Sequence, residues 1–301
     1  MKPQYLQLDT NTIQERIDSA LQILSSCEVC PRICQVNRNA GETGLCKTAR
    51  YAHLASYHLH FGEEPQLVGR RGSGTIFFAG CNLGCLFCQN YDISHYTKGY
   101  IQVLPEQLAK VMLELQEKGA HNINFVTPSH VVPQILESLP LAIEHGLNLP
   151  LVYNCGGYES LETLRMLDGI IDIYMPDIKF ADPKIAEKYC NAPDYPEKAQ
   201  NALKEMHRQV GDLETDPKGL ASSGLLVRHL LMPDNLASTE RWIDFISREI
   251  STDTCLHLME QYFPAGNIQG YPELQQKVSL EEYRSALDLA RKYKLTPLEI
   301  L

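Results

Sequence analysis

The chain has 301 residues, enough for one large α/β domain or two smaller ones. Hydrophobic residues make up 44% of it and charged residues 21%, and the formal net charge of −10 argues against generic binding of nucleic acid, whose phosphates repel an acidic surface. No uncharged apolar run reaches the ~18 residues of a membrane span, and residues 1–12 lack an apolar signal core, so we expect no membrane partner and a cytoplasmic location.

The first part of the chain combines a helix with a cysteine-rich loop. Residues 11–26 carry apolar side chains at helical spacing behind the cap candidates Asp9, Thr10 and Asn11, which predicts an amphipathic helix. Cysteines follow up to Cys46, and residues 47–72 are typical of short strands and turns. We therefore expect residues 1–72 to form an N-terminal helix and a cysteine-rich, metal-binding region.

From residue 75 onward, strand patterns alternate with helix patterns. The six expected strands are residues 75–79, 122–126, 149–153, 170–174, 224–231 and 254–259. The expected helices are residues 105–118, 132–145, 160–167, 183–190, 195–210, 239–249 and 280–293. Such alternation predicts a parallel sheet with right-handed crossovers. Six units are too few for a closed eight-fold barrel, so an open partial barrel and a doubly wound sheet both remain. We expect this unit to span residues 73–260, with a C-terminal loop and helix in residues 261–301.

Three cysteines follow the first expected strand of this series. Cys81, Cys85 and Cys88 have C-x3-C-x2-C spacing, and Gly84 lets the loop bend so that the thiolates converge. Three thiolates can bind three corners of a cubane iron–sulfur cluster, and the missing fourth ligand leaves one iron open for catalysis. A structural zinc site with His95 as a fourth ligand, or a chance grouping of buried cysteines, is the alternative, but zinc sites usually take four protein ligands.

The spacing, with the aromatic Phe87 before the last cysteine, resembles the radical S-adenosylmethionine (SAM) signature. The longer string GCNLGCLFCQNY at residues 80–91 resembles the pyruvate formate-lyase activating-enzyme group, and within it a subfamily with a cysteine-rich N-terminus. The resemblance implies a partial (β/α)6 barrel with an N-terminal cysteine-rich extension. It also implies a 4Fe–4S cluster on the three cysteines, which receives electrons from a reductant such as flavodoxin or ferredoxin and cleaves SAM to a 5′-deoxyadenosyl radical.

The same resemblance implies where SAM is held, at the C-terminal ends of the strands. The family's Gly-Gly-Glu at the second strand is absent, and Ser129, Thr127 or backbone carbonyls would replace it. The implied contacts are Phe87, Ser129, Asn154, Asp177, Lys179 and His229. Without the resemblance, Thr127 and Ser129 are also typical of a plain loop, and Asn154 of a tight turn before a helix. Asp177 and Lys179 are also typical of a solvated surface pair, and Arg228-His229 is equally typical of a ligand contact and of a structural ion pair.

A second set of cysteines lies in the N-terminal loop. Cys27, Cys30, Cys34 and Cys46 have C-x2-C-x3-C-x11-C spacing. Four clustered thiols in a reducing compartment indicate metal rather than disulfides. Four thiolates complete a tetrahedral zinc site or a cubane, and the spacing leaves both open.

The leading interpretation is a radical SAM enzyme that activates a glycyl-radical-type protein. The alternative is a radical SAM enzyme that acts on a small molecule or a peptide. A non-catalytic metal-binding module that relays electrons is a third hypothesis, but it predicts two saturated sites, and Cys81, Cys85 and Cys88 are one ligand short.

Overall fold

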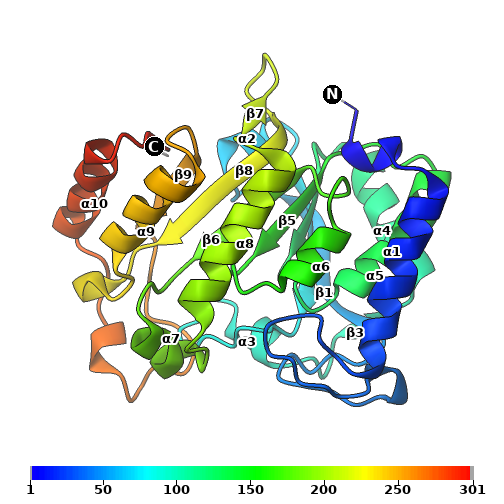
Figure 1. Cartoon of the computed structure of the whole chain (residues 1–301), viewed down its shortest axis with the longest axis horizontal. Coiled ribbons are helices and arrows are strands. Elements are labelled where there is room, and N and C mark those ends of the chain that lie inside the picture. The colour runs from blue at the N-terminus through cyan, green and yellow to red at the C-terminus, as the bar shows by residue number, and fades with distance from the viewer. Residues whose placement is uncertain (1, 299–301) are drawn as a thin grey trace.

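The computed structural model describes residues 2–298 (Figure 1). Its strands are β1 (Ala52–His60), β2 (Ser73–Ala79), β3 (Ile101–Val103), β4 (Ile123–Val126), β5 (Leu151–Cys155), β6 (Ile173–Ile178), β7 (Glu214–Thr215), β8 (Ala221–Leu230), β9 (Cys255–Met259) and β10 (Pro297–Leu298). Its helices are α1 (Thr10–Gln22), α2 (Pro65–Val68), α3 (Tyr91–His95), α4 (Pro105–Glu117), α5 (Val132–Glu144), α6 (Leu161–Met166), α7 (Pro183–Cys190), α8 (Tyr195–Val210), α9 (Thr239–Phe245) and α10 (Leu280–Lys292).

The strands within residues 2–298 form one sheet in the order β10-β9-β8-β6-β5-β4-β2-β1-β3, with β7 paired to β8. The run from β2 through β4, β5, β6 and β8 to β9 is parallel throughout. These are the six strands predicted from the sequence, and each is followed by at least one helix. The sheet is not closed, because β3 and β10 are its edges, so the predicted α/β class and the partial barrel are confirmed.

The N-terminal part is joined to this sheet. Where short strands were expected, β1 runs for nine residues and pairs antiparallel with both β2 and β3. Helix α1 begins at Thr10 and is capped by Asp9, one of the expected cap candidates, whose side chain accepts a hydrogen bond from the Thr12 backbone at 2.9 Å. Its buried residues Ile13 and Ile17 share one hydrophobic core with the barrel, and α1 packs against α5.

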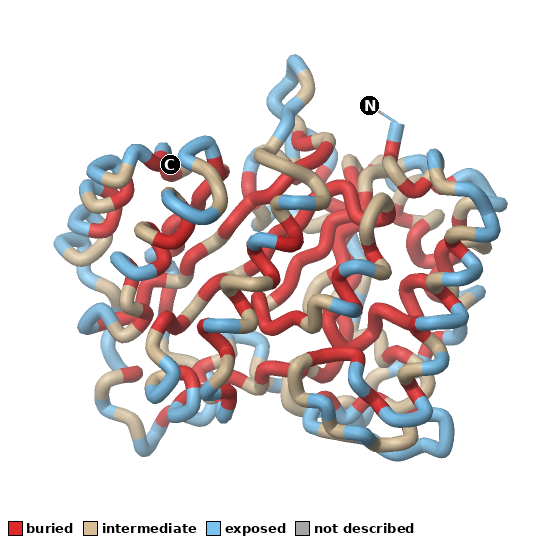
Figure 2. Tube along the Cα trace, in the orientation of Figure 1, coloured by how far each residue is buried: buried red, intermediate tan, exposed pale blue. Residues whose placement is uncertain are grey.

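The strands lie at the centre of the molecule and are mostly buried, whereas the helices expose their outer turns (Figure 2). The cysteine-rich N-terminal loop, α3 and α7 gather at one end of the molecule, at the bottom of Figure 1. This is the end where the parallel strands finish, the usual place for ligands in such sheets. No helix within residues 2–298 has both the length and the apolar character needed to cross a membrane.

Candidate active site

The loop that follows β2 brings its three cysteines to one pocket. Cys81, Cys85 and Cys88 line a cavity of about 320 Å³ at the C-terminal ends of the strands. Gly84 has a φ of 64°, which glycine adopts without steric cost, and so allows the turn between Cys81 and Cys85. Phe87 lines the same cavity and packs edge-on against Phe180, with ring centroids 5.4 Å apart. All three cysteines therefore reach the same pocket.

These thiols are held in an apolar setting. Burial raises the pKa of Cys81 to about 12 and also raises the pKa of Cys88. The pKa of Cys85 is raised as well, first by a hydrogen bond with Cys190, whose sulfur lies 3.4 Å from that of Cys85. At neutral pH such thiols stay protonated unless a cation or a metal stabilises the thiolate.

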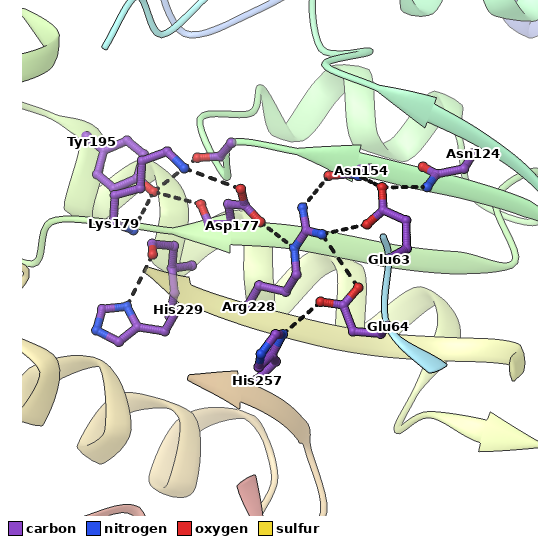
Figure 3. Close-up of polar contacts among 12 residues, drawn as sticks. Glu63, Glu64, Asn124, Asn154, Asp177, Lys179, Tyr195, Arg228, His229 and His257 are labelled. Carbon is purple, nitrogen blue, oxygen red and sulfur yellow. Dashed lines mark hydrogen bonds and ion pairs between the residues drawn. The ribbon is translucent and has the colours of Figure 1, made fainter. Parts of the chain in front are cut away.

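Arg228 is the centre of a buried polar network inside the barrel (Figure 3). Its Nε donates to Asp177 at 2.6 Å, its Nη1 to Glu63 at 2.8 Å and its Nη2 to Asn154 at 2.8 Å. Arg228 Nη1 also lies 3.5 Å from Glu64. These contacts join β5, β6 and β8 to the segment between β1 and α2.

Lys179 completes the charge pattern beside the cysteines. Its Nζ lies 3.4 Å from Asp177 Oδ2, and both residues line the pocket. Burial disfavours the charged form of Lys179, but the Asp177 carboxylate and the nearby thiols of Cys85, Cys190 and Cys88 together more than offset this, so the pKa of Lys179 is raised. The network thus contains two cations, Arg228 and Lys179, against the three carboxylates of Glu63, Glu64 and Asp177.

Four of the six residues expected to contact SAM line this pocket: Phe87, Asn154, Asp177 and Lys179. The structure does not bring the other two into it. Ser129 is buried, and its hydroxyl donates to Glu159 at 2.5 Å. His229 is buried on the other side of β8, between the Ile178 carbonyl at 3.1 Å and Thr239 at 3.0 Å. Successive residues of a strand face opposite sides, so Arg228 points into the barrel and His229 away from it.

Sequence reasoning missed the acidic pair Glu63-Glu64 and its partner His257, which contacts Glu64 Oε1 at 2.8 Å. The dipeptide stands before Pro65 in a region expected to hold short strands and turns. The Pro65 that follows predicts a helix start but not where the carboxylates point. Only the antiparallel pairing of β1 with β2 places this segment next to the start of β2.

The four N-terminal cysteines also meet in space. Cys27, Cys30, Cys34 and Cys46 line a small cavity of about 10 Å³ together with Arg38 and His130. As they stand, no three His, Cys, Asp or Glu side chains within residues 2–298 surround one point closely enough to hold a single metal ion. The cavity therefore gathers the right ligand type, and the thiols would have to turn towards one another to bind a single ion.

Comparison with known proteins agrees with the motif and the barrel. A family model described as "Radical SAM superfamily" matches residues 75–215, which include the three cysteines and the pocket strands up to β6. Residues 75–215 therefore form a radical SAM superfamily domain. Such a domain implies an enzyme that uses a 4Fe–4S cluster and SAM.

Relatives extend the match beyond the family core. The uncharacterized protein MJ0674 of Methanocaldococcus jannaschii is 32% identical over 292 residues, which cover 95% of this chain and 80% of that protein. The uncharacterized protein MJ0808 of the same organism is 25% identical over 188 residues, 55% of this chain and 52% of that protein. A radical SAM methyltransferase from Sphaerobacter thermophilus has a similar fold, with a TM-score of 0.51 at 13% identity over 75% of this chain and 65% of the methyltransferase chain. That likeness supports the fold alone.

Proposed function

We propose that Cys81, Cys85 and Cys88 hold the 4Fe–4S cluster of this radical SAM enzyme. The observation that carries the proposal is the meeting of three thiols from one short loop in a cavity of about 320 Å³, far larger than a single ion needs. Three ligands leave one iron open to SAM. When bound and reduced, such a cluster supplies the electron that splits SAM into methionine and a 5′-deoxyadenosyl radical.

The charged network suits SAM. SAM carries an ammonium, a sulfonium and a carboxylate, so it has an excess of one positive charge, whereas the pocket network has three carboxylates and two cations. We assign the SAM carboxylate to Lys179 and the ribose hydroxyls to Asp177 and Asn154, because cations bind carboxylates and carboxylate or amide oxygens accept from hydroxyls. Arg228 orients Asp177 and Asn154 by donating to both.

The methionine amine of SAM needs hydrogen-bond acceptors. The Gly-Gly-Glu that would supply them is absent from this chain. Thr127 lines the pocket at the end of β4 and has a φ of 58°, while Ser129 is bonded to Glu159. A non-glycine residue with a positive φ is uncommon and often found at binding sites. We therefore assign the amine to Thr127 rather than to Ser129.

For the substrate, we propose a glycine on a glycyl-radical-type protein, with electrons delivered by flavodoxin or ferredoxin in the cytoplasm. The resemblance of residues 80–91 to activating enzymes supports this choice. The buried network around Arg228 also occupies the interior of the barrel, so the substrate must approach from the C-terminal ends of the strands. A backbone glycine on a flexible segment can reach such a mouth without needing a deep cavity.

We also propose a second metal centre, zinc or iron–sulfur, on Cys27, Cys30, Cys34 and Cys46. Two buried side chains that line the cysteine cavity each keep a nitrogen without a hydrogen-bond partner, Arg38 Nη2 and His130 Nδ1. Unpaired buried polar atoms are costly, and an anionic thiolate centre would accept from Arg38.

The backbone beside these cysteines is also strained. Ile33 and Gln35, on either side of Cys34, have φ values of 41° and 54°. A β-branched residue at positive φ is a genuine outlier, which persists only when its surroundings hold it. Metal bonds to Cys34 would supply such a restraint.

The test of the catalytic assignment is a Cys81→Ala/Cys85→Ala/Cys88→Ala variant, with Cys155→Ala as a matched control, because Cys155 lines the same pocket from β5. After anaerobic reconstitution, the triple variant should yield no 5′-deoxyadenosine, while the control should still cleave SAM. Reductive SAM cleavage by the triple variant would show that the assignment is wrong. Metal analysis of the same variant tests the second centre, which should remain bound.

The substrate proposal needs a separate assay. Pyruvate formate-lyase serves as the probe, mixed anaerobically with the reduced enzyme and SAM. A glycyl-radical signal in electron paramagnetic resonance (EPR), with a matching amount of 5′-deoxyadenosine, is the expected result. Abundant 5′-deoxyadenosine with no glycyl signal would favour a small molecule or a peptide instead.

A further inference from the structure

Arg32 connects the N-terminal cysteine loop to the catalytic loop. It stands between Cys30 and Cys34, and its guanidinium reaches two other segments of the chain. Its Nε donates to the Asn82 carbonyl at 2.8 Å, and its Nη2 donates to the Leu83 carbonyl at 2.9 Å. Both carbonyls lie between Cys81 and Cys85.

The same guanidinium caps the end of α7. Arg32 Nη2 also donates to the Cys190 carbonyl at 2.8 Å, and Nη1 donates to the Asn191 carbonyl. A cation at this position satisfies carbonyls that a helix end leaves unpaired and is favoured by the helix dipole. All three guanidinium nitrogens thus bind backbone oxygen, which the planar fork of arginine suits better than lysine.

The end of α7 is itself attached to the catalytic loop. The Leu86 backbone donates to the Tyr189 carbonyl at 2.9 Å, and the sulfur of Cys190 lies 3.4 Å from that of Cys85. The Arg32 guanidinium also lies 5.2 Å above the ring of Tyr158, whose carbonyl accepts from Asn82 at 2.6 Å. Any shift of Arg32 therefore moves the supports of the loop that contains Cys81 and Cys85.

We propose that the N-terminal metal centre positions the catalytic loop through Arg32. This inference rests on the proposed function, including the second metal centre. Metal bound by Cys30 and Cys34 would immobilise the residues on both sides of Arg32, and Arg32 would then fix the loop between Cys81 and Cys85. Arg32 is a positioning residue, since it touches backbone carbonyls rather than the cluster or SAM. Loss of the N-terminal metal should loosen the catalytic cluster even though none of its ligands has changed.

The experiment compares Arg32→Ala and Arg32→Lys with Arg16→Ala in the reconstituted full chain. Arg16 is a matched control, because it also donates to distant backbone carbonyls, those of Met166 and Asp168, but away from the site. Three quantities are measured: metal at the N-terminal centre, the rate at which the catalytic cluster loses iron to EDTA, and its EPR spectrum after reduction. The Cys81→Ala/Cys85→Ala/Cys88→Ala variant gives the contribution of the N-terminal centre alone.

In Arg32→Ala, iron loss from the catalytic cluster should be faster by about 10- to 100-fold, the effect of one hydrogen bond to a charged group. Its EPR spectrum should change, and N-terminal metal should remain bound, which also shows that the chain has folded. Arg32→Lys should fall between Arg32→Ala and the unaltered enzyme, and Arg16→Ala should match the unaltered enzyme. Iron loss and EPR spectra unchanged in both Arg32 variants would overturn the inference and leave the proposed function standing.

A double-mutant cycle tests the route of the coupling. Cys46→Ala, which removes an N-terminal ligand, should speed iron loss as Arg32→Ala does, and the double variant should be no faster than either alone. Additive rates would overturn the inference, since the two changes would then act independently. Failure of the proposed function is distinguishable, because the unaltered enzyme would then bind no cluster that depends on Cys81, Cys85 and Cys88.

Discussion

Lys179 is the cation that faces the cysteine end of the pocket. It is paired with Asp177, and its charged form is favoured. If it binds the SAM carboxylate, Lys179→Ala should weaken SAM binding by about 10- to 100-fold, the effect of losing a hydrogen bond between charged groups. Calorimetry should detect this while iron content stays the same. Lys204→Ala, which removes an exposed partner of Glu249, is the control. An unchanged SAM affinity would mean that Lys179 only balances Asp177.

A second residue, Glu159, is expected to make the free energy of unfolding depend on pH. Burial raises its pKa to about 7, although Ser129 and Tyr153 donate to it. The unfolded carboxyl titrates near pH ~4.3, so between these values the native state holds a proton that the unfolded state has lost. The free energy of unfolding should therefore fall as pH rises from about 4.5 to 7 and stay level above that range.

Glu159→Gln should remove the part of this pH dependence that Glu159 contributes, leaving that of Asp172, whose pKa burial raises to about 6, and should stabilise the chain at pH 8 by on the order of 1–3 kcal/mol. Unfolding midpoints at pH 5 and pH 8 would measure it. Glu162→Gln, an exposed neighbour at the start of α6, is the control and should keep the slope of the unaltered chain. If the stability of Glu159→Gln fell with pH as steeply as that of the unaltered chain, Glu159 in the folded chain would already be ionised below pH 5.

At the scale of elements, the two cysteine loops lie against each other at Gly80. A side-chain carbon at this position would come within 2.2 Å of the Cys46 carbonyl. Gly99 has a similar positive φ, 98° against 86°, but nothing lies within 4 Å of its would-be side chain. The pair therefore separates the effect of crowding from that of backbone strain.

Gly80→Ala should lower the free energy of unfolding by about 1–3 kcal/mol more than Gly99→Ala, the usual cost of overpacking. It should also reduce metal binding at both cysteine sets, because the backbones of the two loops must move apart. Denaturation curves and metal analysis of the two variants would measure this. Equal losses of stability and of metal binding in the two variants would mean that the two cysteine loops can move apart without an energetic cost.

For the whole molecule, the N-terminal region and the barrel share one sheet and one core. Strand β1 pairs with β2, and the buried residues of α1 and α5 belong to one hydrophobic cluster. A chain that lacks residues 2–22 should expose the apolar face of α5, so amide hydrogen exchange should rise in α5 and β4 but not in α8. Exchange unchanged in α5 would support an N-terminal region that folds separately, within the residues 1–72 expected from the sequence.

Local patterns in the sequence determined much of this protein. The apolar spacing of each βα unit predicted all six parallel strands, and the short spacing of Cys81, Cys85 and Cys88 forced those thiols together. Asp177 and Lys179 are two residues apart, and residues two apart on an extended segment share a face. Each of these features depends on a few neighbouring residues.

Only the tertiary structure decided which polar residues meet. Glu63 and Arg228 are 165 positions apart, and Arg32 and Asn191 are 159 apart. Their contacts depend on how β2 pairs with β1 and on where α7 ends. No local sequence pattern encodes either feature. The register of β8 places Arg228 inside the barrel and His229 on the opposite face of the strand. Ser129 donates a hydrogen bond to the Glu159 carboxylate and does not line the pocket. Side-chain direction follows from packing across the whole sheet, so the sequence could propose the candidates for the site but not choose among them.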